Sequence, residues 1–145
     1  MSTLINWLEA GRRLAERIPY SFVALVSRLA IASVFWRSGQ TKVDGFLHVK
    51  DSTFFLFREE YMVPLLPPDV AAYLTTFAEH FFSIFLVVGL ASRLSALGLI
   101  LMTAVIQIFV YPEAWPTHLS WAGLMLSLIA YGGGKWSTDQ MFGIS

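Results

Sequence analysis

The fold of this chain depends on its long apolar stretches, and the first of them, Tyr20 to Ser38, reads YSFVALVSRLAIASVFWRS. A helix needs about 20 mainly apolar residues to cross the hydrocarbon core of a bilayer. Three further stretches meet this requirement, namely Asp69 to Leu90, Leu94 to Tyr111 and Thr117 to Gly133. None of the four carries the continuous charged face that a helix of a soluble bundle presents to water. We therefore expect an all-α fold, a polytopic membrane four-helix bundle.

The ends of these stretches carry the residues typical of span boundaries. Pro67 and Pro68 precede the second stretch, and a proline is accepted at the start of a helix. The run Gly132 to Gly134 ends the fourth, because consecutive glycines continue a helix poorly. Aromatic side chains gather at the span ends, as in the interfacial belts of membrane proteins. They are Trp36, Tyr111, Trp115 and Trp121 on one side, and Tyr20, Tyr131 and Trp136 on the other.

The composition supports this interpretation and excludes several functions. Of the 145 residues, 56% are hydrophobic and 14% charged, the formal net charge is +0 and the mean hydropathy is +0.61. We expect a single domain over residues 1–145 and no nucleic-acid partner, because no excess of basic residues is present. The chain has no cysteine, which excludes disulfides, iron–sulfur clusters and covalent haem. Redox chemistry would then come from a bound cofactor or a partner subunit.

Two segments outside the spans are also expected to be helical. Before Pro19, Leu4, Trp7 and Leu8 share one side of a helix and charged residues lie opposite, which is typical of an amphipathic helix in the membrane interface. The first loop, Gln40 to Pro68, contains a short helix beginning at Asp51. Its aromatic residues suggest either a lid over the mouth of the bundle or an interfacial packing helix.

The distribution of basic residues suggests an orientation. Four spans put both termini on one side of the membrane, and that side carries five basic residues: Arg12, Arg13, Arg17, Arg93 and Lys135. The other side carries four, Arg37, Lys42, Lys50 and Arg58. The positive-inside rule therefore favours cytoplasmic termini.

Two ionisable residues lie near the middle of spans. Arg28 and Glu79 are each within about one residue of a span midpoint, so the sequence predicts that they lie at similar depth and form an ion pair. Charges at mid-bilayer cost about 2.5 to 3.5 kcal/mol each on insertion scales and often mark binding sites or proton pathways. The pair would either fix the helix register or form the centre of a binding site.

Other polar residues lie toward the side opposite the termini. Gln107, His118, Arg37 and Lys42 could line a cavity that runs outward from Arg28 and Glu79, with Trp36 and Trp115 at its entrance. Each also has a structural explanation, such as snorkelling to head groups or bridging two helices. The three histidines lack metal-ligand spacing, so we expect no metal site.

Several motifs resemble those of a known family. The run from Arg28 to Lys42, RLAIASVFWRSGQTK, resembles the first helix of DoxX-type membrane proteins, with an early arginine followed by an aromatic pair, a glycine and a lysine. Glu79 and the turn Gly89 to Arg93 resemble the second-helix glutamate and the following Gly-Leu-x-x-Arg turn. The resemblance covers roughly Leu25 to Lys135, and it makes Arg28, Lys42 and Glu79 family-like positions.

Two further motifs, Glu60 to Pro68 (EYMVPLLPP) and Val105 to Trp115 (VIQIFVYPEAW), resemble a bacterial subgroup. Members of that subgroup are associated with enzymes that modify small copper- or stress-related peptides. His80 stands where the subgroup usually has a nonpolar residue. The resemblance implies a multi-pass protein of the bacterial inner membrane that serves a partner oxidoreductase or peptide-modifying enzyme.

Our leading hypothesis is a membrane component of an oxidoreductase system, with a quinone-like or small polar ligand among Arg28, Glu79 and Gln107. We expect a non-catalytic membrane subunit rather than a stand-alone enzyme. The alternatives are a small transporter or export accessory for a metabolite or modified peptide, which would act as a homodimer because four spans are few for alternating access, and a purely structural membrane anchor.

Overall fold

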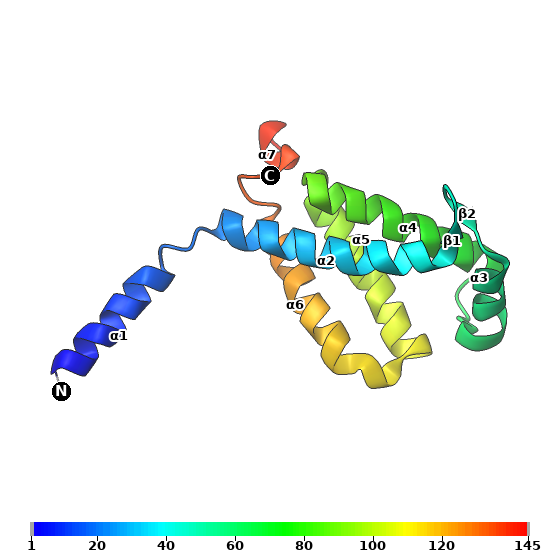
Figure 1. Cartoon of the computed structure of the whole chain (residues 1–145), viewed down its shortest axis with the longest axis horizontal. Coiled ribbons are helices and arrows are strands. Elements are labelled where there is room, and N and C mark those ends of the chain that lie inside the picture. The colour runs from blue at the N-terminus through cyan, green and yellow to red at the C-terminus, as the bar shows by residue number, and fades with distance from the viewer. Residues whose placement is uncertain (1, 145) are drawn as a thin grey trace.

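The structure is a computed structural model that describes residues 2–144, and most of it is helical (Figure 1). Five helices of 14 or more residues follow each other along the chain. They are α1 (Ser2–Ala15), α2 (Tyr20–Lys42), α4 (Pro68–Val88), α5 (Ser92–Val105) and α6 (Trp115–Tyr131). Shorter helices are α3 (Asp51–Phe55), the π-helical η1 (Leu56–Tyr61) and η2 (Ile106–Val110), the 3₁₀ turn η3 (Pro112–Ala114) and α7 (Thr138–Met141).

Three helices are long and apolar enough to cross a membrane: α2, α4 and the continuous helix Ser92–Val110 formed by α5 and η2. They coincide with the first three predicted spans, although α2 continues four residues beyond the predicted end, to Lys42. The fourth predicted span corresponds to α6, which has 17 residues.

The four long helices after α1 pack into one body. Helix α2 lies against α4 and α6, and α5 lies against the same two helices, so each of the four has two neighbours. Their shared core is closely packed and includes Ile31, Phe35, Leu86, Leu99 and Leu128, all 2% exposed or less. Many apolar side chains on the outside of this body are exposed, as expected for helices surrounded by lipid.

Two close approaches fix the register of the antiparallel helices α2 and α4. Gly39 of α2 lies so close to α4 that a Cβ atom there would be 3.3 Å from the Cβ of Glu79 and 2.7 Å from the ring of His80. At the opposite end, Gly89 lies against the guanidinium of Arg28. Gly39 is therefore level with Glu79, and Arg28 is level with the end of α4.

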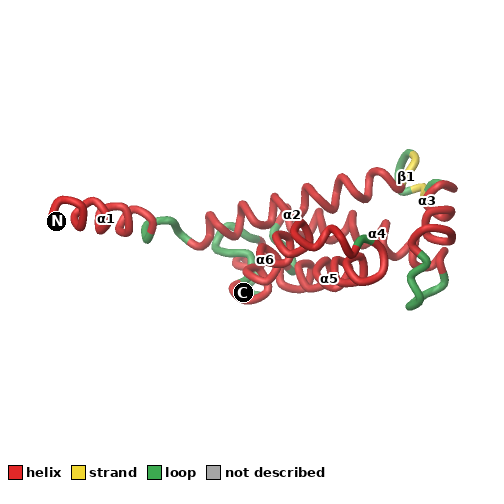
Figure 2. Tube along the Cα trace, turned by 90° about the horizontal axis from the view of Figure 1, so that it is seen from below, coloured by secondary structure: helices red, strands yellow, loops and turns green. Residues whose placement is uncertain are grey.

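Helix α1 projects from the body (Figures 1 and 2), and residues 3–19 are all exposed. The helix predicted before Pro19 is therefore present. Its apolar side, which includes Leu4, Trp7 and Leu8, packs against nothing in the described chain.

The first loop forms a small cap at the far end of α2 (Figure 1). The predicted short helix begins at Asp51 as expected, but no side-chain hydrogen bond caps it, and it continues into η1. The sequence did not predict the antiparallel ladder of β1 (Val43–Asp44) and β2 (His48–Val49), in which Val43 pairs with Val49. This ladder is a local departure from the expected all-α fold, and it turns the chain back toward α4.

Candidate functional site

A buried ion pair links α2 to the middle of α4. The Lys42 Nζ atom donates to both carboxylate oxygens of Glu79, at 2.9 and 2.8 Å, and also to Ser38 Oγ at 2.9 Å. Ser38 Oγ in turn donates to Glu79 Oε1 at 2.9 Å. The Glu79 side chain is 1% exposed and that of Lys42 is 12% exposed. The charges therefore compensate each other, and every carboxylate oxygen has a hydrogen-bond donor.

The local sequence explains why these groups meet. Ser38 and Lys42 are four residues apart on α2, so both side chains lie on one face of the helix. That face meets α4 at the level of Glu79 because Gly39 allows the two backbones to approach closely. A pair of opposite charges with good geometry greatly reduces the cost of burying either charge alone.

The predicted ion pair between Arg28 and Glu79 is wrong. Arg28 is buried, but its Nη1 atom donates to the carbonyl oxygens of Leu86 and Val87, at 3.1 and 3.3 Å, and its Nη2 atom donates to Trp136 O at 2.6 Å. The prediction assumed that span midpoints lie at equal depth. The register instead places Arg28 eleven residues, or roughly 16 Å along the helix axis, from the level of Glu79.

Arg28 and Asp139 together hold the turn between α4 and α5. The arginine binds the last carbonyl groups of α4, where a cation also interacts favourably with the helix dipole. The carboxylate of Asp139 accepts from the backbone N–H groups of Ala91 and Ser92, at 2.6 and 2.8 Å, and so caps the start of α5. These contacts give Arg28 a structural role. Asp139 lies outside the apolar stretches, so hydropathy gave no signal for its part in this site.

A cavity of about 110 Å³ adjoins the Lys42–Glu79 pair. Ser38, Lys42 and Glu79 form its polar part, and Phe57 and Tyr61 of η1 contribute aromatic walls. Tyr111 also lines it, and its ring packs edge-on against that of Tyr61 at 5.9 Å between centroids. The first loop therefore covers this cavity, in the manner of the lid that the sequence suggested.

Tyr61 supplies a hydroxyl group to the cavity. Burial, and secondarily the contact with Tyr111, raises the pKa of Tyr61, so its hydroxyl group stays protonated. The only hydrogen-bond contact of this hydroxyl in the described chain is Tyr111 Oη, at a long 3.5 Å. Tyr61 can therefore donate a hydrogen bond to an acceptor in the cavity.

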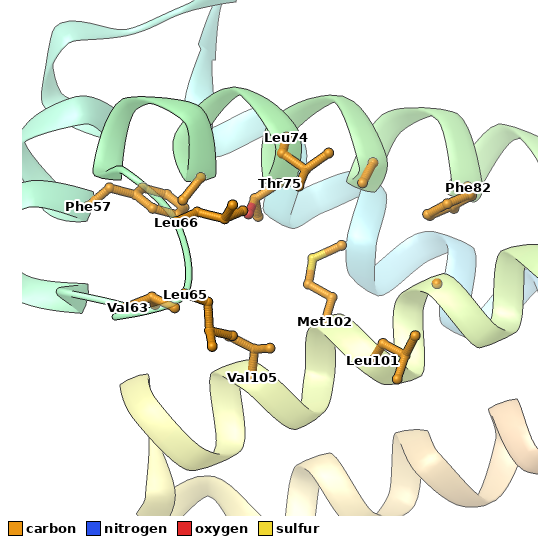
Figure 3. Close-up of a pocket in the computed structure, with 13 residues that line it drawn as sticks. Phe57, Val63, Leu65, Leu66, Leu74, Thr75, Phe82, Leu101, Met102 and Val105 are labelled. Carbon is orange, nitrogen blue, oxygen red and sulfur yellow. The ribbon is translucent and has the colours of Figure 1, made fainter.

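An apolar groove between α4 and α5 adjoins the cavity. Its volume is about 290 Å³, and Figure 3 shows Leu74 and Thr75 of α4 opposite Leu101 and Met102 of α5. The groove and the cavity share several lining residues. These shared residues are Phe57, Val63, Thr75, Met102 and Val105. The cavity, called the chamber below, carries a cluster of polar groups, and it lies next to the apolar groove.

The remaining predicted site residues lie elsewhere. Gln107 and His118 form a separate cluster, with Gln107 Oε1 and His118 Nδ1 2.7 Å apart, and line a groove with Trp115. Trp36 is half exposed and packs edge-on against His80 at 5.1 Å between ring centroids. Arg37 is exposed. The single predicted cavity is therefore divided, and only Lys42 and Glu79 of the predicted set lie at the covered chamber.

The fold and the buried polar pair define the class of this molecule, a multi-pass helical membrane protein. The DoxX family model matches residues 23–112, more than half of the chain, and the protein belongs to the DoxX family. DoxX proteins are membrane proteins and are often associated with oxidoreductases. The match includes Lys42, Glu79 and Tyr61, and it ends before His118. Searches of curated proteins and of solved structures found no significant match.

Proposed function

We propose that this protein is a membrane subunit of an oxidoreductase system and binds a quinone-like ligand at the chamber beside Lys42 and Glu79. The observation that carries this proposal is the adjacency of the chamber to the apolar groove between α4 and α5. A polar ring in the chamber and an apolar chain in the groove would match both environments. The proposal leaves out Arg28, because it lies away from the chamber and both of its terminal nitrogens donate to backbone carbonyl groups.

The chemistry of the chamber favours a neutral head group with a carbonyl acceptor. Lys42 and Glu79 cancel each other's charge, so the pair offers no excess charge to an anion. Among the described residues, the hydroxyl groups of Tyr61 and Thr75, which both line the chamber, donate to no acceptor. A chamber of about 110 Å³ has room for one small ring, or for about three to four water molecules.

The redox partner would be a separate protein. The chain has no cysteine, so it offers no thiol or iron–sulfur chemistry of its own. The two motifs that resemble the peptide-modification subgroup also contribute to the chamber walls. Glu60 to Pro68 supplies Tyr61 and Val63, and Val105 to Trp115 supplies residues of η2 and Tyr111. We therefore propose a partner oxidoreductase or peptide-modifying enzyme that exchanges ligand with this chamber.

We further propose how the protein sits in the bacterial inner membrane. Helix α6 would be the fourth span, because it is apolar and packs beside α5 and α2. Helix α1 would lie in the interface, because its apolar side is uncovered and the ion pairs Arg12–Glu16 (3.4 Å) and Arg13–Glu9 (3.7 Å) lie on its polar side. Both termini would then lie on one side of the membrane. That side carries five basic residues against four on the other, so it would be the cytoplasmic side.

The alternative of a transporter receives less support. A transport path requires polar groups that continue across the membrane. The polar residues form separate clusters around Glu79, His118 and Arg28, and each cluster is bound to its own helices. The structure therefore favours ligand binding from the bilayer over passage through the bundle.

The proposal can be tested by measuring equilibrium binding of a decyl-chain benzoquinone to the full chain in lipid nanodiscs. Quenching of tryptophan fluorescence reports the binding. We expect saturable binding by the wild type, and an affinity at least about tenfold lower for Glu79→Gln and for Tyr61→Phe, which lose an ion-pair or a hydrogen-bond partner. Arg37→Gln changes an exposed charge and serves as the control. Absence of saturable binding by the wild type, or unchanged affinity in both site variants, would overturn the proposal.

A further inference from the structure

A second polar feature, the Gln107–His118 cluster, lies between η2 and α6, away from the chamber. His118 is 6% exposed, and its Nδ1 atom is 2.7 Å from Gln107 Oε1. The Gln107 Nε2 atom donates to the carbonyl oxygen of Pro112 at 2.7 Å. The amide nitrogen and the amide oxygen of Gln107 are therefore each oriented by a hydrogen-bond partner.

These contacts fix the tautomer of His118. The carbonyl oxygen of Pro112 can only accept, so the amide nitrogen of Gln107 must face it and the amide oxygen must face His118. That oxygen also only accepts, so His118 Nδ1 must carry the proton. In the neutral ring the other nitrogen, Nε2, then holds a lone pair.

The lone pair of His118 has no partner among the residues described. Its Nε2 atom makes no hydrogen bond to any of these residues. The atom is not fully enclosed, so a ligand can reach it. His80 provides a contrast, because its Nδ1 atom donates to Thr76 O at 2.7 Å and its Nε2 atom accepts from Gln40 at 2.9 Å. His80 is satisfied on both sides, whereas His118 is satisfied on one.

His118 lines a groove between α5 and α6 with a volume of about 320 Å³. Its neighbours in the groove are mainly apolar, and the one hydroxyl group, that of Thr103, already donates to Leu99 O at 2.8 Å. The lining residues are Ile100, Thr103, Ala104, Gln107, Trp115, His118, Leu119 and Ala122. A hydrogen-bond acceptor in apolar surroundings is costly unless a donor reaches it.

We propose that this groove is a second ligand site, which takes a membrane-dissolved phenol through an O–H···Nε2 hydrogen bond to His118. The acceptor nitrogen requires a ligand with a hydroxyl donor, and the apolar walls match an aromatic ring or alkyl chain. A ligand with only carbonyl acceptors cannot donate a hydrogen bond to this nitrogen. The site differs in this respect from the chamber, where the Tyr61 hydroxyl offers a donor.

The inference does not depend on ligand binding at the chamber. The two sites share no lining residue. The groove at His118 requires a ligand that donates a hydrogen bond, whereas the chamber favours a ligand that accepts one. If a quinone-like ligand does occupy the chamber, its reduced hydroxyl form would be the form that suits the His118 groove.

The test uses the full chain with ¹⁵N-labelled histidine in lipid nanodiscs, titrated with 4-decylphenol and, as matched control, with its methyl ether. The ether keeps the ring and the chain but lacks the donor. Side-chain ¹⁵N spectra should show His118 with a protonated Nδ1 atom, and the Nε2 resonance should shift saturably with the phenol and not with the ether. The His80 resonances should stay in place, because Gln40 already occupies its Nε2 atom.

Two variants complete the experiment. His118→Phe should remove the responding resonance, and Gln107→Leu, which no longer fixes the tautomer, should weaken phenol binding by about tenfold while keeping the histidine observable. Tyr61→Phe, which alters the chamber without leaving a buried charge uncompensated, should leave the response unchanged, so failure here is distinguishable from failure at the chamber. Equal shifts with phenol and ether, no shift with either, or a protonated Nε2 atom in the free protein would each overturn the proposal.

Discussion

At the scale of single residues, the central feature is the Lys42–Glu79 pair. Replacing one member of a buried pair leaves the other charge without compensation, which typically costs about 3–5 kcal/mol. We expect Glu79→Gln and Lys42→Met each to lower the free energy of unfolding in detergent by several kcal/mol. The double variant Lys42→Met with Glu79→Leu should recover most of this loss, because no isolated charge remains.

The exposed pair Arg58–Asp69 is the control for that experiment. Its atoms are 2.6 Å apart, but the side chains are 54% and 49% exposed. Arg58→Gln should therefore change the stability much less than Glu79→Gln, because solvent screens an exposed pair. Similar losses for Arg58→Gln and Glu79→Gln would contradict the special importance of the buried pair.

Gly39 allows a second prediction at this scale. Its missing side chain leaves room for His80, and an added Cβ atom would lie 2.7 Å from the ring. Gly39→Leu should push α2 from α4 and lower the thermal midpoint of unfolding, at a cost of about 1–3 kcal/mol or more. Gly123→Leu is the matched control, since no atom lies within 4 Å of a Cβ atom there. Equal midpoints for the two variants would show that the close approach does not set the register.

At the scale of elements, the periodicity and length of the apolar stretches were sufficient to predict α2, α4 and α5, whose starts lie within two residues of the expected positions. The side-chain pairing was not predictable in the same way. The partner of a buried charge is determined by the register of the two helices. That register depends on contacts such as Gly39 with His80, which a hydropathy pattern does not reveal. The spacing of Ser38 and Lys42 was the one local signal that could have identified the partner of Glu79.

The groove between α4 and α5 supports a prediction about ligand tails. Leu101 lies on its wall and is 60% exposed, so Leu101→Trp should obstruct the groove without opening the core. We expect the affinity for a decyl-chain quinone to fall several-fold and that for the ring without a tail to stay unchanged. Leu94→Trp alters a side chain of similar exposure, 64%, on the same helix outside the groove and should bind both compounds as the wild type does.

At the scale of the whole molecule, the four proposed spans cross the membrane an even number of times, so both termini lie on the same side. The chain has no cysteine, so single cysteines can be introduced at Thr3, Phe46 and Phe142, all of them exposed. An impermeant maleimide should label the first and third positions from the cytoplasmic side and Phe46→Cys, at the tip of the hairpin, from the opposite side. Labelling of the two terminal positions from different sides would show that α6 does not cross the membrane.

The whole molecule also shows why composition alone could not locate the site. The polar residues near the spans form three clusters. The cluster around Arg28 lies at the end of α4, and the cluster around Gln107 lies near Pro112, before the start of α6. Among the described residues, the cluster at Glu79 is covered by η1 and joined to the apolar groove between α4 and α5. The arrangement of η1 over the chamber depends on the hairpin after Lys42, which the sequence did not predict.

The most direct test of the central claim is photoaffinity labelling with an azido-quinone that carries a decyl chain, followed by mass spectrometry of the labelled peptides. We predict that the head group labels the peptides containing Tyr61 and Tyr111, and that excess unlabelled quinone removes this label. Labelling that is concentrated around Arg28 and Trp136, or that unlabelled quinone does not displace, would contradict the claim that a membrane ligand occupies the chamber beside Lys42 and Glu79.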